Sequence, residues 1–434
     1  MTVSDAPSRA TPKRVSPARL AVATMVGTMI EAYDLVLYSV VAALAFNHVC
    51  FPGVAPWVGT LAALASHAVA FFMRPLGAIL FGYLGDRSGR VKALRISLLT
   101  MGIATLLIGV LPTAAQIGVL APILLVVLRL AQGVAMGGEY GGAVAMSTES
   151  APPAKRALFG TFPNTGSIFG AAFAILVSVV LVSAFDDAAL VGWAWRLPFF
   201  LSAVLIGIGF LVRRIGESEE FEKATADSTS TPKPVPSLGR KLRLIGIATL
   251  LLTPNTLIFY VIVTSFLAYV RGGGVPGLTV AHYQVVTFVA MSLSCVLNLG
   301  GGFLSLRVPR HRIVVGACLW GAAAAFPAIL LLQTGRTWLV LLGIVLLIPA
   351  HALLSGVTTA YVSDALPVRF RYTGVGLGYA IGAGVGSGLL PLLLLWLIGP
   401  TGALWPFALL VCLVCLGAVV GVLFVQRAGS GRPA

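Results

Sequence analysis

Residues 82–92 read GYLGDRSGRVK, and a later stretch, residues 302–312, reads GFLSLRVPRHR. The leucine at the third position and the three basic positions coincide in the two stretches. A second echo, at nearly the same offset, pairs an acidic residue, a proline and an arginine in two other polar segments: Glu149, Pro152 and Arg156 with Asp364, Pro367 and Arg371. Two independent echoes at nearly one offset predict a chain built from two similar halves.

Long apolar runs flank these polar segments. The chain of 434 residues is 58% hydrophobic and 10% charged, whereas a soluble domain has about 25% charged residues. The apolar runs have about 18 residues or more, which is enough to cross a hydrocarbon core of about 30 Å as a helix. We therefore predict an all-α integral membrane protein with twelve transmembrane helices in two pseudo-symmetric bundles of six. The predicted helices cover residues 19–46, 57–83, 93–112, 118–146, 157–184, 194–213, 244–270, 281–305, 312–332, 337–363, 371–398 and 403–426.

The polar segments also divide the chain into regions. The linker is assigned because its first part is rich in Glu, Lys, Ser, Thr and Pro. The predicted regions are a cytoplasmic N-terminal tail (1–18), a six-helix bundle (19–216), a cytoplasmic linker (217–243), a second six-helix bundle (244–426) and a cytoplasmic C-terminal tail (427–434).

The net charge of +15 follows the predicted topology. Lysines and arginines crowd the segments on one side of the predicted membrane, whereas the other side holds only Arg196, Arg271 and Arg336. Because basic residues favour the cytoplasmic side, we expect both termini to be cytoplasmic. This placement explains the positive charge without nucleic-acid binding, for which the sequence holds no motif.

Charged residues well inside the predicted spans occur only in the first half of the chain: Glu31, Asp34, Arg74, Arg129 and Glu139. A charge at bilayer depth costs roughly 2.5–3.5 kcal/mol, so such residues face an interior cavity and one another. In helix one, Glu31, Asp34 and Tyr38 share a face. Two neighbouring carboxyls in a low dielectric do not both ionise cheaply, which favours a proton carrier.

In helix four, Arg129, Gln132, Met136 and either Glu139 or Tyr140 lie along one stripe. An arginine binds a carboxylate through two parallel hydrogen bonds. The functional interpretation assigns Arg129, Gln132 and Arg74 to a substrate carboxylate, and the three acidic residues to coupled protons. The alternative is that these charges only pair with one another and hold helices one, two and four together.

Other polar residues are candidates for the lining of the same cavity. Tyr38, Asn164 and Tyr260 are assigned to substrate binding, although Asn and Tyr also join membrane helices by hydrogen bonds. His67 and His351 are left open between a titrating role and a packing role.

With these residues identified, the sequence resembles the major facilitator superfamily. Residues 82–92 match the loop signature of that superfamily, G-x-L-x-D-R-x-G-R-x-K. Further stretches resemble its metabolite:proton symporter branch, whose members carry shikimate, 2-oxoglutarate, citrate, proline or betaine: residues 30–34 (IEAYD), 72–77 (FMRPLG), 129–142 (RLAQGVAMGGEYGG) and 195–199 (WRLPF). Ala32 stands where that branch usually has tryptophan, and Leu306 stands where the second copy of the loop signature has an acidic residue.

The resemblance implies a cytoplasmic gate at the signature loop, formed by Gly85, Asp86, Arg87, Gly89 and Arg90. Charged groups at a membrane edge cap and pair with helix ends, and so close the cytoplasmic side in one state. Alternatively, Arg90 has no role in the gate, and its positive charge only holds this loop on the cytoplasmic side.

Together, these patterns predict a secondary active transporter that takes up a small carboxylate-bearing or zwitterionic metabolite with protons by alternating access. We expect a multi-pass protein of the inner membrane that works as a monomer. Its partners are the small-molecule substrate, protons and the lipid bilayer, and the proton gradient stands in place of a cofactor. A proton-driven exporter or exchanger is the alternative. A sensor or an intramembrane enzyme is less favoured, because no zinc-protease, serine-hydrolase or nucleotide-binding motif occurs.

Overall fold

The computed structural model describes residues 17–53, 56–88, 90–149, 151–152, 155–212, 237–366, 368–401 and 404–429. Within these residues the chain forms helices and turns and no strand. Twelve helices are long and apolar enough to cross a membrane. The prediction of an all-α membrane protein is therefore confirmed. The predicted N-terminal tail, most of the linker and the end of the C-terminal tail lie outside the described residues.

Among the described residues, the first half consists of six long helices joined by short connecting ones. The long helices are α1 (Pro17–Val41), α3 (Pro56–Ser88), α4 (Arg90–Gly109), α6 (Leu120–Glu149), α7 (Arg156–Ala184) and α9 (Leu197–Val212). α1 continues through a π-helical turn, η1 (Ala42–Phe46), into α2 (Asn47–Val49). The short elements are α5 (Ala114–Ile117), α8 (Asp187–Gly192) and η3 (Ala194–Arg196).

The second half repeats this plan with two interrupted helices. The seventh span consists of α11 (Leu238–Tyr260), η5 (Val261–Ser265) and α12 (Phe266–Arg271), and the eleventh of α16 (Val368–Ala383), η6 (Gly384–Leu389) and α17 (Leu390–Thr401). The others are α13 (Val280–Leu304), α14 (Arg310–Leu332), α15 (Thr337–Ala365) and α18 (Trp405–Gly429). Residues 238–243, which the sequence assigned to the linker, are the first turns of α11, because a helix can extend past the membrane through basic residues, which are good helix formers.

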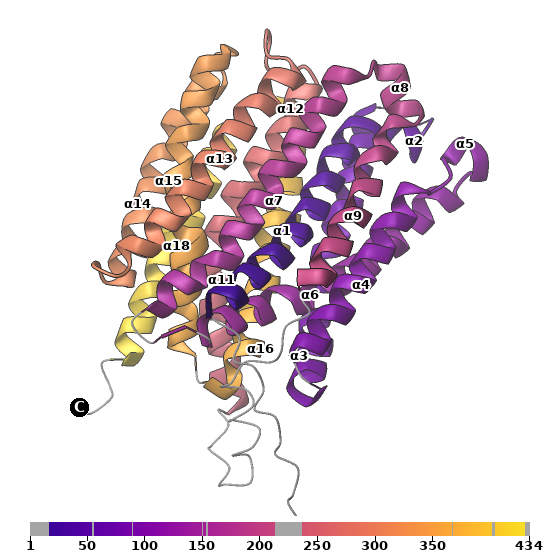
Figure 1. Cartoon of the computed structure of the whole chain (residues 1–434). Helices are drawn as coiled ribbons and strands as arrows, with labels where there is room; N and C mark the ends of the chain where they lie inside the picture. The colour runs from indigo at the N-terminus through magenta and orange to yellow at the C-terminus, as the bar shows by residue number, and fades with distance from the viewer. Residues whose placement is uncertain are drawn as a thin grey trace, which may run out of the picture.

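The two halves have matching internal packing. In the first half α1 packs on α7, α3 and α4 pack on α6, and α4 packs on α9. In the second half the corresponding pairs are α11 with α16, α13 and α14 with α15, and α14 with α18. The halves meet where α7 contacts α13 and α15, and where α16 contacts α3 and α6 (Figure 1). This repeated pairing confirms the two pseudo-symmetric six-helix bundles expected from the sequence echoes.

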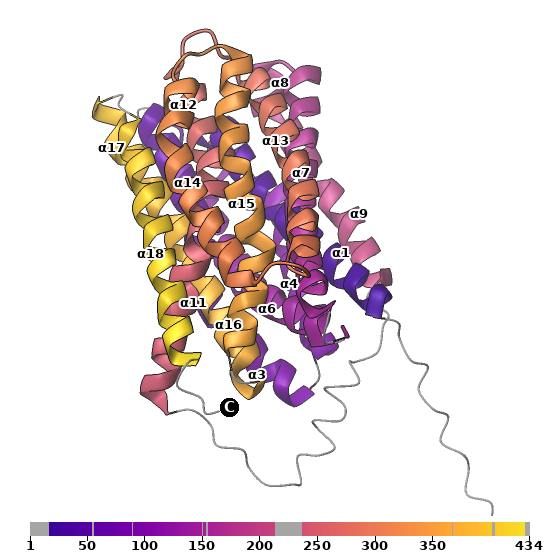
Figure 2. The same ribbon diagram turned by 90° about the vertical axis from the view of Figure 1, so that its left-hand side faces the viewer.

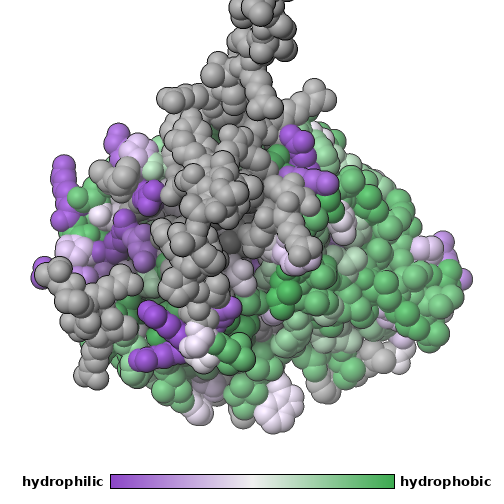
Figure 3. All heavy atoms as spheres, turned by 90° about the horizontal axis from the view of Figure 1, so that it is seen from below, coloured by the Kyte–Doolittle hydropathy of each residue, from purple (hydrophilic) through white to green (hydrophobic). Residues whose placement is uncertain are grey.

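The flank of the bundle is apolar, whereas hydrophilic residues gather at one end. Large apolar side chains such as Phe72, Val296 and Leu330 are more than half exposed, which suits contact with lipid rather than water. α1 begins, and α18 ends, at the same end of the bundle (Figure 2). Seen from that end, hydrophilic residues gather on the face while the visible flank is largely hydrophobic (Figure 3).

Glycines let α3 and α6 approach until their backbones touch. A Cβ atom at Gly77 would lie 1.9 Å from the carbonyl oxygen of Val134, and one at Gly137 would lie 2.1 Å from the carbonyl oxygen of Arg74. Because the obstructing atoms belong to a helix backbone, no side-chain rotation relieves the overlap. This contact fixes the distance between the two helices that carry Arg74 and Arg129.

Alanine in place of Gly137 is therefore expected to lower the thermal unfolding midpoint of the detergent-solubilised protein, because overpacking costs about 1–3 kcal/mol or more. The matched control is Gly300→Ala in α13, where an added Cβ meets no atom within 4 Å. Differential scanning fluorimetry of both variants checks the difference. Equal midpoints would show that α3 and α6 separate without cost.

Candidate functional site

Arg129 is a buried cation without an acidic partner. It projects from α6 and is 0% exposed. Its guanidinium donates hydrogen bonds to Oε1 of Gln132 at 2.8 Å, and to Nδ1 and the carbonyl oxygen of His67 at 3.2 and 3.3 Å. Its Cζ lies 3.8 Å from the centroid of the Tyr38 ring. No carboxylate of a described residue lies within 4.0 Å of this guanidinium, so the groups that contact it directly are neutral.

Asp34 is connected to Arg129 through two neutral side chains. It lies on α1 and is 1% exposed. Thr105 of α4 donates to its Oδ2 at 2.9 Å, and Ser202 of α9 donates to its Oδ1. Gln132 in turn donates from Nε2 to Oγ1 of Thr105 at 2.6 Å. A continuous chain of hydrogen bonds therefore runs from Asp34 through Thr105 and Gln132 to Arg129, across α1, α4 and α6.

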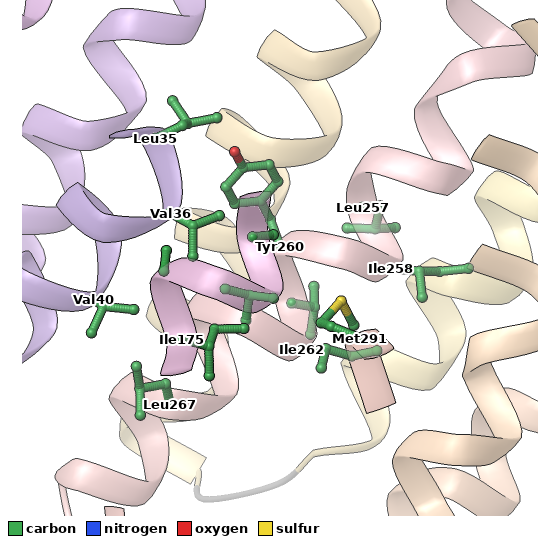
Figure 4. Close-up of a cluster of buried hydrophobic side chains, with 14 of the residues drawn as sticks. Leu35, Val36, Val40, Ile175, Leu257, Ile258, Tyr260, Ile262, Leu267 and Met291 are labelled. Carbon is green, nitrogen blue, oxygen red and sulfur yellow. The ribbon is translucent and has the colours of Figure 1, made fainter. Parts of the chain in front are cut away.

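Aromatic rings surround the site from both halves of the molecule. The ring of His67 lies 5.8 Å from that of Tyr38, 5.2 Å from that of Phe71 and 5.6 Å from that of Tyr260, between centroids. The Tyr38 hydroxyl hydrogen-bonds Oγ of Ser66 at 2.6 Å. Tyr260 belongs to α11, so the second half contributes a wall to a site whose charges come from the first. Figure 4 shows Tyr260 in one cluster of buried side chains with Leu35 and Val36 of α1.

Arg74, in contrast, has an acidic partner. Its guanidinium lies 2.9 Å from Oε1 of Glu31, and both side chains are buried. Its Cζ lies 5.8 Å from the centroid of the Tyr379 ring of the second half. This is the arrangement that the charge-pairing alternative expects of Arg74. Glu31 and Asp34, three residues apart on α1, thus bond to different helices and share none of these partners.

We predict that Glu31→Gln destabilises the protein by about 3–5 kcal/mol, because it leaves the buried Arg74 without its anion. The double variant Glu31→Gln/Arg74→Met is expected to recover most of that loss, since it removes both charges together. Chemical denaturation of the three proteins in the same detergent measures the difference. A double variant no more stable than the single one would mean that the pair does not act as a unit.

Asn164 lies in a separate polar cluster that joins the halves. The Tyr140 hydroxyl donates to Oδ1 of Asn164 and hydrogen-bonds Oγ1 of Thr359, both at 2.9 Å, and Ser355 donates to the same Oδ1 at 3.2 Å. The rings of Tyr140 and Tyr379 stack with centroids 3.7 Å apart. α6 and α7 of the first half are thereby tied to α15 and α16 of the second.

The remaining candidates lie apart from Arg129. Glu139 is buried in α6, ten residues and hence about 15 Å along the helix from Arg129. His351 on α15 bonds Ser294 at 2.8 Å and stacks on Phe259 with centroids 5.4 Å apart, which are contacts of packing.

The predicted cytoplasmic gate lies at the junction of two helices. The backbone of Gly85, Asp86 and Arg87 belongs to the last turn of α3, and Arg90 begins α4. Gly89 and the side chains of these gate residues lie outside what the structure describes. Their role stays a prediction.

Two hydroxyl residues of this site were not predicted from the sequence. Thr105 and Ser202 are both 0% exposed, and each donates a hydrogen bond to Asp34. A lone hydroxyl in an apolar helix carries no sequence signal of such a partner, because serine and threonine commonly bond their own helix backbone.

Comparison with known proteins covers most of the chain. The model of the family described as the Major Facilitator Superfamily matches residues 22–377. The shikimate transporter of Escherichia coli is 36% identical over 398 residues, which are 90% of each chain. The inner membrane metabolite transport protein YhjE of the same organism is 34% identical over 384 residues, which are 87% of each chain.

A solved structure has the same fold. The proton:xylose symporter XylE superimposes with a TM-score of 0.73 over 95% of both chains, at 15% sequence identity. At that identity the likeness concerns the arrangement of helices and not the bound solute.

Proposed function

The chain belongs to the major facilitator superfamily and is a metabolite transporter rather than an enzyme; from this premise we propose that it takes up a small carboxylate-bearing or zwitterionic metabolite together with protons. The relative named as a shikimate transporter makes shikimate and similar acids the first solutes to test. The relative named as an inner membrane protein supports an inner-membrane location.

The burial of Arg129 without an acidic partner is the observation that carries the proposal. A buried cation whose direct contacts are all neutral is costly, and an incoming carboxylate lowers that cost. The contrast with Arg74, which already has Glu31, makes Arg129 the better anchor for a substrate anion. The rings of Tyr38 and Tyr260 supply apolar walls for the carbon skeleton, as is usual for sites that bind small molecules.

Asp34 is the best candidate for the coupled proton. Its carboxyl is buried at membrane depth and, among the described residues, bonds directly only to the hydroxyls of Thr105 and Ser202, so no cation forms an ion pair with it as Arg74 does with Glu31. A carboxyl in such a place becomes neutral by taking up a proton. Glu31, by comparison, is already paired with Arg74. Glu139 stays a second candidate.

Alternating access requires that the two halves separate first on one side of the site and then on the other. On one side, α1 contacts η5, in a cluster of buried aliphatic side chains that includes Val36, Ile175 and Ile262 (Figure 4). On the other side, the stacked Tyr140 and Tyr379 join α6 to α16. Both contacts are formed here and the site side chains are buried, as in an occluded state. Each contact opens in turn during transport.

The distribution of basic residues supports cytoplasmic termini. Among the described residues, basic side chains cluster near the helix ends on the side where α1 begins: Arg19, Lys92, Arg95, Lys155, Arg156, Arg240, Lys241, Arg243, Arg307, Arg310 and Arg312. The opposite ends carry Arg196, Arg271 and Arg336. This asymmetry is the signal that sets membrane orientation.

Uptake into proteoliposomes tests the proposal. Purified protein is reconstituted, an inward proton gradient is imposed, and accumulation of labelled shikimate, 2-oxoglutarate, citrate, proline and betaine is followed with and without a protonophore. We expect gradient-dependent accumulation of at least one of these solutes. If the inward proton gradient instead drives a solute out of the vesicles, the exporter is favoured. If none of these solutes accumulates, proton-coupled uptake of this substrate class is refuted.

A further inference from the structure

We propose that the hydroxyl of Thr105 is the switch through which protonation of Asp34 changes the affinity of Arg129 for substrate, an inference that rests on the proposed function. Among the described residues, Thr105 is the side chain that hydrogen-bonds both to Asp34, the candidate proton site, and to Gln132, which bonds Arg129. It comes from α4, a helix without any of the five charges that the sequence singles out.

The geometry around Thr105 provides two positions for one hydrogen. Its Oγ1 lies 2.9 Å from Oδ2 of Asp34 and 3.0 Å from the carbonyl oxygen of Met101, and it accepts from Nε2 of Gln132 at 2.6 Å. A hydroxyl has one hydrogen to donate and two lone pairs to accept with. Thr105 therefore donates either to Asp34 or to Met101, and it has an accepting position for Gln132 in both cases.

The charge of Asp34 selects between these positions. As a carboxylate, Asp34 only accepts, so the Thr105 hydrogen points to Oδ2. When a proton binds to Oδ2, that oxygen becomes the donor, and its hydrogen points to Oγ1 of Thr105. The Thr105 hydrogen then turns to the carbonyl oxygen of Met101. One proton is taken up, no covalent bond of the protein other than this O–H forms or breaks, and Asp34, Thr105 and Gln132 all keep hydrogen-bond partners.

The switch changes how firmly Gln132 is held. While Thr105 donates to a carboxylate, its oxygen is polarised and is a stronger acceptor for Nε2 of Gln132. Gln132, so held, keeps its Oε1 on Arg129 at 2.8 Å. When Thr105 instead receives the proton of Asp34, its oxygen is shared between two donors and the bond to Gln132 weakens. Arg129 is then freer to turn toward a substrate carboxylate, so a bound proton raises substrate affinity, as symport requires.

Other charges near Asp34 also act on it, so the experiment must separate their direct electrostatic effect from the effect of the Thr105 hydroxyl. The titratable groups that act electrostatically on Asp34 are Tyr33 on its own helix and Arg129 on α6. The contacts from α4 and α9 are the hydroxyls of Thr105 and Ser202. Arg129 also senses the charge of Asp34 directly through space. A valine at position 105 keeps that direct interaction and removes only the hydroxyl.

The test compares substrate affinity at two pH values in four proteins. The probe is radiolabelled shikimate, or whichever labelled acid of the uptake panel the wild type accumulates, and the half-saturation concentration is measured by counterflow at pH 6 and pH 8. We expect at least about a tenfold difference in the wild type, within the usual range for coupled sites, and less than about twofold in Thr105→Val. Thr105→Ser is expected to restore the difference. Thr100→Val is the matched control, because Thr100 lies on the same helix and bonds only the carbonyl oxygen of Ile96 among the described residues.

The outcomes separate this inference from the proposed function. If the half-saturation concentration of Thr105→Val changes between pH 6 and pH 8 as much as that of the wild type, Asp34 and Arg129 are coupled directly through space. The switch is then refuted, while proton-coupled uptake stands. If the wild type accumulates no acid of the panel, the proposed function fails and the switch fails with it. Size-exclusion profiles of the four proteins identify a variant that is merely unfolded. If Thr105→Val is unfolded, Thr105→Ser becomes the test, because it keeps the hydroxyl and must therefore show the wild-type change in half-saturation concentration between pH 6 and pH 8.

Discussion

Lysine in place of Arg129 is expected to raise the substrate concentration for half-maximal uptake by on the order of 100-fold. Lysine keeps the positive charge but offers a point charge instead of a planar fork, so it loses a parallel bond to a carboxylate and the contacts to Gln132 and His67. A hydrogen bond to a charged group contributes about 1.5–3 kcal/mol. The upper part of that range corresponds to about 100-fold, since each 1.4 kcal/mol is tenfold. Initial rates of gradient-driven uptake at a series of substrate concentrations measure the effect.

The control for this variant is Arg336→Lys. Arg336 is exposed at the start of α15, far along the chain from the site, and its replacement is expected to leave half-saturation unchanged. Circular dichroism and size-exclusion profiles establish that both variants are folded. Half-saturation at the wild-type concentration in Arg129→Lys would mean that Arg129 is not a carboxylate ligand, and the charge-pairing alternative would then extend to it.

Asparagine in place of Asp34 is expected to reduce gradient-driven accumulation to a ratio of about one between the inside and the outside of the vesicle, because an amide neither gains nor loses a proton in this range. The amide also has the shape of a protonated carboxyl: its N–H₂ donates to Thr105 and its oxygen accepts from Ser202. Counterflow, which needs no net proton movement, is expected to remain measurable. The loss therefore concerns the coupling and not the path of the substrate.

Asp187→Asn is the matched control for Asp34→Asn. Asp187 is exposed at the start of α8 and its change removes the same charge from the chain. It is expected to accumulate substrate as the wild type does. If Asp34→Asn also accumulates substrate to the wild-type ratio, the proton is carried elsewhere, and Glu139→Gln becomes the next protein to measure.

The fold could be predicted because the bilayer leaves few choices. An apolar run long enough to span the membrane must be a helix, and the two echoed loops indicate duplication. The interruptions of the helices could not be predicted in the same way. The π-helical turn at Ala42–Phe46 occurs in a stretch as apolar as its neighbours, and the extension of α11 to Leu238 contains basic residues that a hydropathy criterion rejects.

The site was only partly predictable for a different reason. Charges stand out in an apolar sequence, so Asp34 and Arg129 were found. Thr105 could not be told apart from Thr287, which bonds the carbonyl oxygen of Tyr283 in its own helix at 2.9 Å. The difference lies in which helices pack around each hydroxyl. For the same reason the sequence predicted Asn164 to line the site of Arg129, whereas in the structure its side chain hydrogen-bonds Tyr140 and Ser355.

The position of the charged groups along the chain has a consequence for how the protein is made. The hydrogen-bonded chain from Asp34 to Arg129, the Ser202 contact and the Glu31–Arg74 pair all lie within residues 31–202. A ribosome synthesises that half first. Each buried charge in these contacts therefore meets its partner before the second half leaves the ribosome. The hydrogen bonds and the ion pair that hold these buried charges therefore do not depend on the later helices.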